Sequence, residues 1–237
     1  MKINSLKNYQ LLALIIFGSI YILVSCKMNT PILSFGESHI RLINASPDNN
    51  AIDFYINDTL KNSSPLAFGQ NTNYATISGG VNHFQVKANG NLVNHSDLTF
   101  QLDTNKYFTV FVAGNISKDS MSYVSLQDDL KVLSDTTAKV RFVNLVSNSP
   151  YLDVVVSTNP QDSIPSFSGI NFGSGADYKE FKSGNYTIKF RQTGKNIDLA
   201  SPITLQLDAT KIYTLWAKGF VNGIGAQALS PSLLTDN

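Results

Sequence analysis

Ile40-Arg41-Leu42-Ile43-Asn44 decides the fold, because the same pattern returns 100 residues later as Val140-Arg141-Phe142-Val143-Asn144. Further along, Leu98-Thr99-Phe100-Gln101-Leu102-Asp103 is matched by Ile203-Thr204-Leu205-Gln206-Leu207-Asp208. Small insertions have moved the offset from 100 to 105 residues by that point. Segments that match in the same order over this length indicate an internal repeat, so the chain contains one module twice.

Each copy consists of short segments in which apolar and polar residues alternate. Ile40 and Leu42 fall on one face of the first segment, whereas Arg41 and Ile43 fall on the other, as the period of two of a strand requires. Asn, Gly, Asp, Ser and Pro separate the segments at the spacing of a sandwich. We therefore predict an all-β protein with two tandem antiparallel β-sandwich domains, immunoglobulin-like or transthyretin-like, after an N-terminal signal helix.

The repeat and the flanking composition divide the chain into four expected segments. Residues 1–25 are a signal peptide, and residues 26–37 are a lipidated cysteine and a tether, since Pro31 and the lack of alternation are typical of a linker. The two repeats occupy residues 38–130 and 138–231, and a short polar stretch separates them.

The N-terminus has the anatomy of a bacterial lipoprotein signal peptide. Lys2 and Lys7 precede an apolar run that ends in Leu23-Val24-Ser25-Cys26. A small residue allows cleavage between Ser25 and Cys26, and the thiol of Cys26, the only cysteine, takes a diacylglycerol. Palmitate is the acyl chain that we expect on this lipidated cysteine. The alternative is an ordinary cysteine within a transmembrane anchor. We expect a lipid-anchored protein of the cell envelope, in the outer membrane, on either face of it.

The composition excludes one large class of partners. Of the 237 residues, 43% are hydrophobic and 15% are charged, with 18 basic and 17 acidic side chains. A balance this even, without a basic stripe, lacks the positive field with which nucleic-acid-binding proteins gather phosphates. The hydrophobic share is sufficient for packed cores and argues against disorder. DNA and RNA are therefore not expected as partners.

The sequence contains no motif with the spacing of a known catalytic or cofactor site. A metalloprotease helix, a nucleophile elbow, a phosphate loop and a dinucleotide fingerprint are all missing from it. Nothing pairs two carboxylates across a cleft, as a glycosidase requires. The histidines do not have the spacing of zinc ligands; they are His39, His83 and His95. We predict no catalytic step, no cofactor and no metal.

Two sets of acidic residues have structural explanations. Asp48-Asn49-Asn50 and Asp53 bring together oxygen ligands of the kind that calcium prefers, but a turn rich in Asp and Asn explains them without a metal. Asp53 and Asp153 lie within apolar strand segments, where an uncompensated charge would be costly. We expect their partners to be Arg41 and Arg141, or backbone groups.

Aromatic and hydroxyl side chains suggest two kinds of sugar chemistry. Sandwich modules bind sugars on exposed aromatic rings, although most aromatic residues here are expected in a core or interface, since Trp216 aligns with Phe111 in an alternating strand. The candidates for sugar stacking are Tyr55, Tyr74, Tyr178, Tyr186 and Trp216. Four stretches are similar to the Asp-Ser/Thr-apolar acceptor motif of bacterial O-glycosylation: Asp58-Thr59-Leu60, Asp119-Ser120-Met121, Asp135-Thr136-Thr137 and Asp162-Ser163-Ile164.

The repeats resemble the bacterial domain-of-unknown-function family numbered four-three-nine-seven. Members open with a stretch like V-R-V-V-H-A-S-P-D-A-P-A-V-D-V-Y-V, followed by a Phe-Gly pair and a Gly-x-Tyr-x-[IV] strand. The corresponding residues here are 40–48, 51–57, Phe68-Gly69, Phe172-Gly173 and Gly184-Asn185-Tyr186-Thr187-Ile188. The resemblance extends over residues 38–230, although Asn44 and Asn144 stand where the family often has histidine. It implies a secreted or surface-anchored β-sandwich with no assigned reaction.

These observations predict a lipid-anchored cell-envelope protein whose two non-catalytic β-sandwich domains serve binding, adhesion or scaffolding. The alternative is a polysaccharide-binding accessory lipoprotein. The expected partners are the membrane, through the lipid, and an envelope protein or glycan.

Overall fold

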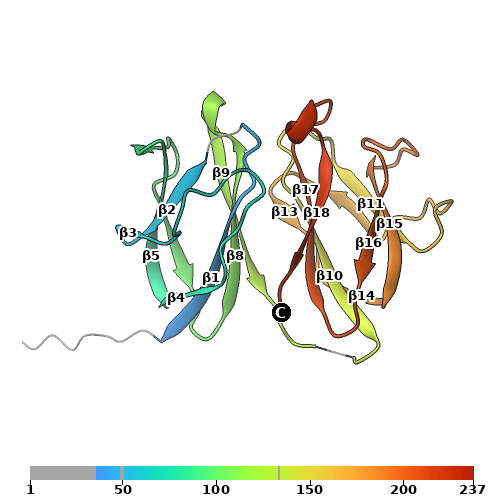
Figure 1. The fold of residues 1–237 in the computed structure, drawn as a ribbon, viewed down its shortest axis with the longest axis horizontal. Coiled ribbons are helices and arrows are strands. Elements are labelled where there is room, and N and C mark those ends of the chain that lie inside the picture. The colour runs from blue at the N-terminus through green and yellow to red at the C-terminus, as the bar shows by residue number, and fades with distance from the viewer. Residues whose placement is uncertain (1–35, 49–50, 133) are drawn as a thin grey trace, which may run out of the picture. The chain divides into compact units, whose positions relative to one another are not determined.

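The computed structural model describes residues 36–48, 51–132 and 134–237 (Figure 1). The predicted signal peptide, the cleavage site between Ser25 and Cys26, the lipidation of Cys26 and nearly all of the tether lie outside these ranges. Within the described ranges, no helix has the length and apolar character needed to span a membrane. The prediction of an all-β fold is confirmed, because the described residues form strands β1 to β18 and, besides these, only two single-turn 3₁₀ helices.

The first repeat folds into two facing sheets, called here sheets 1a and 1b (Figure 1). Sheet 1a has the order β4-β1-β8-β9, with β1 at Glu37–Asn44, β4 at Ala75–Ser78, β8 at Tyr107–Asn115 and β9 at Ser120–Asp128. Sheet 1b has the order β3-β2-β5-β6, and β7 also pairs with β5. Its strands are β2 at Ile52–Ile56, β3 at Thr59–Leu60, β5 at Gly80–Ala88, β6 at Asn91–Leu92 and β7 at Leu98–Leu102. Helix η2, Ile116–Lys118, connects β8 to β9.

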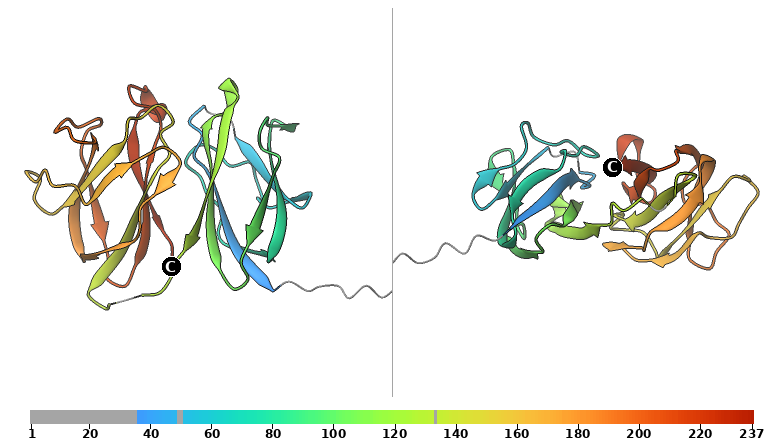
Figure 2. Two further views of the ribbon diagram at one scale, coloured as in Figure 1. Left: turned by 180° about the vertical axis from the view of Figure 1, so that it is seen from behind. Right: turned by 90° about the horizontal axis from the view of Figure 1, so that it is seen from below.

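The second repeat has the same plan, with sheets 2a and 2b (Figure 2). Sheet 2a has the order β13-β10-β17-β18, and β14 also pairs with β10. Its strands are β10 at Thr137–Asn144, β13 at Ser174–Gly175, β14 at Lys179–Lys182, β17 at Ile212–Lys218 and β18 at Ser230–Thr235. Sheet 2b has the order β12-β11-β15-β16, with β11 at Leu152–Ser157, β12 at Phe167–Ile170, β15 at Gly184–Gln192 and β16 at Ile203–Leu207. Helix η3, Gly225–Gln227, precedes β18.

Two details differ from the expected organisation. One pair of strands in each repeat is parallel, β1 with β8 and β10 with β17, whereas the prediction was antiparallel. Parallel neighbours require a long crossover, and here the strands of the opposite sheet supply it. The predicted end of the second repeat at residue 231 is too early, since β18 continues to Thr235. The described residues of both repeats belong to one compact unit.

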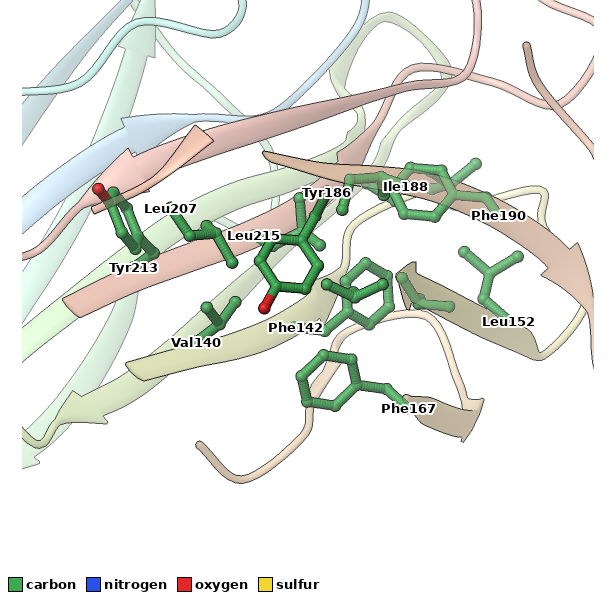
Figure 3. Packing of buried hydrophobic residues seen from close by; sticks show 14 of the residues in the cluster. Val140, Phe142, Leu152, Phe167, Tyr186, Ile188, Phe190, Leu207, Tyr213 and Leu215 are labelled. Atoms are coloured by element: carbon green, nitrogen blue, oxygen red, sulfur yellow. The ribbon is translucent and has the colours of Figure 1, made fainter. Parts of the chain in front are cut away.

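Each repeat has its own hydrophobic core between its two sheets. In the first repeat, Ile40 and Leu42 of β1 meet Phe54 of β2 and Phe84 of β5. Figure 3 shows the second core, in which Phe142 of β10 lies among residues of β11, β12 and β15. Burial of aromatic and aliphatic side chains on the inner faces is the main stabilising contribution in such a sandwich.

Matched glycines end the long strands of the two a sheets. Gly114 has φ +89° and Gly219 has φ +93°, a backbone region that side chains with a Cβ rarely adopt. A Cβ would lie 1.9 Å from the carbonyl oxygen of Ser120 at Gly114, and 2.4 Å from that of Ala228 at Gly219. The same local turn therefore requires glycine in both copies.

Candidate functional site

The outer faces of sheets 1a and 2a share a third hydrophobic cluster that contains residues of both repeats. Because Ile40 and Leu42 point into the first core, the alternate residue Ile43 points out of it, and Val143 does so in the second repeat. Phe111 and Trp216, the matched aromatic residues of β8 and β17, meet there with ring centroids 5.6 Å apart. The other buried members are Ala45, Ala113, Val124 and Leu145. Matched surfaces thus contact each other, as in a two-fold symmetric interface.

Arg41 of the first repeat is bonded to the C-terminal end of the second. Its Nη2 atom lies 2.5 Å from Oδ1 of Asp236, which follows β18, and both side chains are almost fully buried. Nη1 donates to the carbonyl oxygen of Thr235 at 3.0 Å. Nη2 also donates to Oγ1 of Thr109 in its own repeat at 2.9 Å. The guanidinium therefore bridges the two repeats.

Arg141 makes the reciprocal contacts. Its Nη2 atom pairs with Oδ1 of Asp128, the last residue of β9, and these side chains are also almost fully buried. Nη1 donates to the carbonyl oxygen of Gln127 at 3.0 Å. Nε donates to Oγ1 of Thr214 in its own repeat at 2.9 Å. Each arginine thus crosses to the carboxylate that ends the other repeat, and we call these four charged residues the crossed ion pairs.

Matched tyrosines and threonines hold the two carboxylates from their own repeats. Tyr74 donates to Oδ2 of Asp128 at 2.7 Å, and Thr109 donates to the same oxygen at 2.8 Å. Tyr178 and Thr214 donate to Oδ2 of Asp236 at 3.2 and 2.8 Å. The guanidinium of Arg41 also lies 4.5 Å from the ring centre of Tyr74, an arrangement that favours cation–π attraction.

The expected pairing of Arg41 with Asp53, and of Arg141 with Asp153, is corrected by this arrangement. Arg41 and Asp53 stand on the outer faces of opposite sheets of one sandwich, so the core separates them. Asp53 instead accepts a hydrogen bond from Nδ2 of Asn62 at 2.9 Å. Asp153 accepts from the backbone N–H of Gly169 at 2.9 Å and of Gly194 at 3.2 Å. The expected backbone partners are therefore right for Asp153.

The crossed ion pairs are costly to bury and are compensated by their hydrogen bonds. Burial raises the pKa of the Asp236 carboxyl above its usual value, while the guanidinium groups of Arg41 and Arg141 oppose that shift. A buried carboxylate without such partners would be strongly destabilising. These carboxylates are fully engaged with neighbouring side chains, so their contribution is to hold the repeats together.

Tyr74 and Tyr178 are expected to make the folded protein less stable at alkaline pH. Burial and the nearby Asp128 carboxylate raise the pKa of Tyr74 well above its usual value, and burial likewise raises the pKa of Tyr178. Above about pH 10 the unfolded chain loses these phenolic protons while the folded chain keeps them, so stability falls with rising pH.

We expect Tyr74→Phe to unfold more easily than the parent at neutral pH, by about 1–3 kcal/mol, because Asp128 loses a buried donor. The deficit should shrink above about pH 10, since the variant lacks one group that favours unfolding there. Thermal unfolding across this pH range measures both effects, and Tyr151→Phe, at a residue 57% exposed, is the control. A deficit that is constant with pH would contradict the assignment.

The asparagines at the family's frequent histidine position have matched structural contacts. Asn44 donates from Nδ2 to the carbonyl oxygen of Leu66 at 2.9 Å, and its Oδ1 accepts from the N–H of Ser46. Asn144 donates to the carbonyl oxygen of Ile170 at 3.1 Å, and its Oδ1 accepts from the N–H of Val146. In both repeats the amide fastens the end of the first strand to the segment that follows β2 or β11.

The other residues considered for metal binding are spread apart. His83 pairs with Asp97, His95 lies 3.5 Å from Asp119, and His39 stacks on Tyr107. Asp48 accepts hydrogen bonds from Ser46 and from the N–H of Ser117. Asn49 and Asn50 lie outside the described residues. Within residues 36–48, 51–132 and 134–237, no group of three or more His, Cys, Asp or Glu side chains could hold a metal.

The aromatic candidates for sugar stacking are mostly packed, as the alternation indicates. Trp216 is 2% exposed in the shared cluster, and Tyr186 is buried. Tyr74 and Tyr178 are half-buried, and their hydroxyl groups donate to the carboxylates of the crossed ion pairs. Tyr55 lies half-buried on the outer face of sheet 1b, with Nζ of Lys87 4.3 Å from its ring centre. Sugar stacking on Trp216 is therefore not compatible with its burial.

A comparison with protein families covers the first repeat and the start of the second. Residues 38–155 match the model of a family described as Domain of unknown function (DUF4397). These residues belong to the DUF4397 family. The DUF4397 match is shorter than the resemblance over residues 38–230, but it includes Arg41, Asp128 and Arg141. One crossed ion pair thus lies wholly within the DUF4397 segment.

Comparisons with individual proteins add little to the family match. Among curated proteins, none matches the chain in sequence. A carbohydrate-binding module (family CBM26) from Eubacterium rectale, crystallised with maltoheptaose, is 8% identical with a TM-score of 0.27, covering 85% of this chain and 97% of that one. The Bacillus anthracis TIE protein is 11% identical with a TM-score of 0.25, covering 80% of this chain and 34% of that one.

Proposed function

We propose that the protein is a lipid-anchored component of the cell envelope that presents two non-catalytic sandwiches as one binding or scaffolding unit. The supporting observation is the pair of crossed ion pairs between the repeats. Buried charges in an enzyme converge on a cleft and face a substrate. Here Arg41 and Arg141 are directed at Asp236 and Asp128, which suits a unit whose two halves must keep one arrangement.

The anchoring part of the proposal rests on the sequence around Cys26. Cells that express the full chain and are fed an alkyne-bearing fatty acid should label the protein, and Cys26→Ala should remain unlabelled. Mass spectrometry of the labelled protein should place the first residue at Cys26. An intact Met1, or an unmodified thiol at Cys26, would rule out the lipid anchor.

The binding part is tested with the full-length protein immobilised on beads. Envelope protein extract and envelope polysaccharide are passed over the beads separately, with beads carrying the heat-unfolded chain as the control. We expect one fraction to contain a component that is retained saturably by the folded chain alone. Equal retention on the folded and unfolded chains from both fractions would contradict a binding role.

A further inference from the structure

One side of the first repeat contains an open hollow of about 700 Å³, which lies within the range of small-molecule sites. Its walls come from the connection that leaves β3 of sheet 1b and enters β4 of sheet 1a. We call it the 61–75 hollow. The connection pairs with its neighbours at two isolated positions, Leu66 with Ile52 and Asn71 with Ile43. The sheet edges beside it are therefore incompletely covered.

The second repeat has short strands in the corresponding region. There β12 pairs with β11, and β13 and β14 pair with β10. β4 pairs with β1 in the first repeat as β14 pairs with β10 in the second. The two copies differ at the positions of β12 and β13, where the first repeat has only isolated bridges. The first copy thus has isolated bridges in place of two short strands beside the hollow, which points to a local specialisation there.

The lining of the hollow is polar and nearly neutral. Four of its side chains are amides and four carry hydroxyl groups, whereas Lys61 is its one charged side chain among the described residues. Asn62 is occupied structurally, since it bonds to the N–H of Phe54, to Asp53 and to the carbonyl oxygen of Ser64. This buried amide fixes the floor of the hollow.

Other polar groups of the lining are available to a ligand. The exposed side chains of Ser63 and Asn73 make no hydrogen bond to another described residue. Gln70 accepts a hydrogen bond from the N–H of Ala67 through its Oε1. Its Nε2 group makes no hydrogen bond to another described residue. Tyr74 adds a ring that is held in place by Asp128 and Arg41. The hollow thus combines a fixed frame with free amide and hydroxyl groups.

We propose that the 61–75 hollow binds a neutral oligosaccharide, and this inference rests on the proposed binding function. Amide and hydroxyl side chains both donate and accept hydrogen bonds, and so do sugar hydroxyls. A strongly anionic ligand would require more cations than Lys61 alone. A cationic ligand would require a carboxylate, and the described residues of the lining include none. Leu66, Ala75 and the half-buried ring of Tyr74 form the apolar part of the lining, against which a sugar face can pack.

The test is calorimetric titration of the full-length protein with four neutral hexasaccharides, of the cello, malto, xylo and manno series, and with a sulfated heparin hexasaccharide. We expect saturable binding of at least one neutral hexasaccharide at both low and high salt. Asn73→Ala should weaken that binding about tenfold, because a polar contact to the sugar is lost. Asn73→Trp, which fills the hollow from an exposed position, should abolish it.

The matched control is Asp177, the exposed residue that occupies the place of Asn73 in the second repeat. Asp177→Ala and Asp177→Trp should leave the affinity unchanged. Binding of none of the neutral hexasaccharides, preference for the sulfated one, or equal binding by Asn73→Trp would overturn the site. If a protein from the envelope extract is retained while the sugars fail, the proposed binding function stands and the oligosaccharide site falls.

Discussion

Arg141→Met should lower the free energy of unfolding by about 3–5 kcal/mol, because it leaves the Asp128 carboxylate buried without its cation. The hydroxyl groups of Tyr74 and Thr109 would still donate to Asp128, but they do not neutralise its charge. The carboxylate belongs to the first repeat and the arginine to the second. A change in β10 is therefore expected to weaken β9.

Urea unfolding at neutral pH measures the total loss, and hydrogen exchange of the β9 amides shows whether it reaches the first repeat. The control is Lys182→Met, which removes a cation from an exposed position of β14 and should change the stability by no more than about 0.5 kcal/mol. A loss confined to amides of the second repeat would mean that Arg141 does not act across the interface.

Trp216→Ala has a comparable expected effect, a loss of about 3–5 kcal/mol, because it empties a large volume from the cluster shared by the two repeats. The ring that loses its neighbour is Phe111 of the first repeat. Both repeats should be destabilised together, so that the protein unfolds at a lower temperature in one transition. Scanning calorimetry of the parent and the variant provides the measurement.

Trp216→Phe is the matched control, since it places at Trp216 the residue that the first repeat has at the equivalent position, Phe111. It keeps an aromatic ring in the cluster and should recover most of the stability lost in the alanine variant. If Trp216→Ala produced a second transition at an unchanged temperature, the first repeat would be folding independently of the cluster.

The repeat and the alternation of residues were sufficient to predict the strands and the directions of their side chains. Ile40 and Leu42 point inward and Arg41 points outward, as the period of two requires. The same pattern placed Phe111 and Trp216 at equivalent positions, and both are buried in the shared cluster. Strand position thus follows from local sequence, because each residue's face is set by its immediate neighbours.

The partners of the two arginines could not be predicted in the same way. Arg41 and Asp236 are 195 residues apart, and Asp236 lies beyond the expected end of the second repeat at residue 231. Asp53 is nearer to Arg41 in sequence than Asp236 is. The alternation shows that both Arg41 and Asp53 lie on outer faces, but it does not show which of these faces packs against the other repeat. The one available signal was the matched set of Tyr74 with Tyr178 and Thr109 with Thr214, whose hydroxyls require buried acceptors.

The 61–75 hollow was also outside the reach of the repeat comparison. Its residues align with the segment that forms β12 and β13 in the second repeat, so similarity predicts strands there. The irregular path comes from side-chain contacts such as those of Asn62, which occupies the N–H of Phe54 in place of a neighbouring strand. Because a single amide side chain here takes the place of a pairing strand, the alternation of apolar and polar residues does not reveal it.

A double-mutant cycle on Arg41→Met and Asp236→Leu, with urea unfolding as the measurement, tests directly whether the two repeats are joined through exchanged ion pairs. The crossed ion pairs predict a coupling of about 1–3 kcal/mol between these two residues, because they are in direct buried contact. A parallel cycle on Arg41→Met and Asp53→Leu should give a coupling near zero, since the core lies between them. Coupling of Arg41 to Asp53, with none to Asp236, would contradict the claim that the two repeats are joined through exchanged ion pairs.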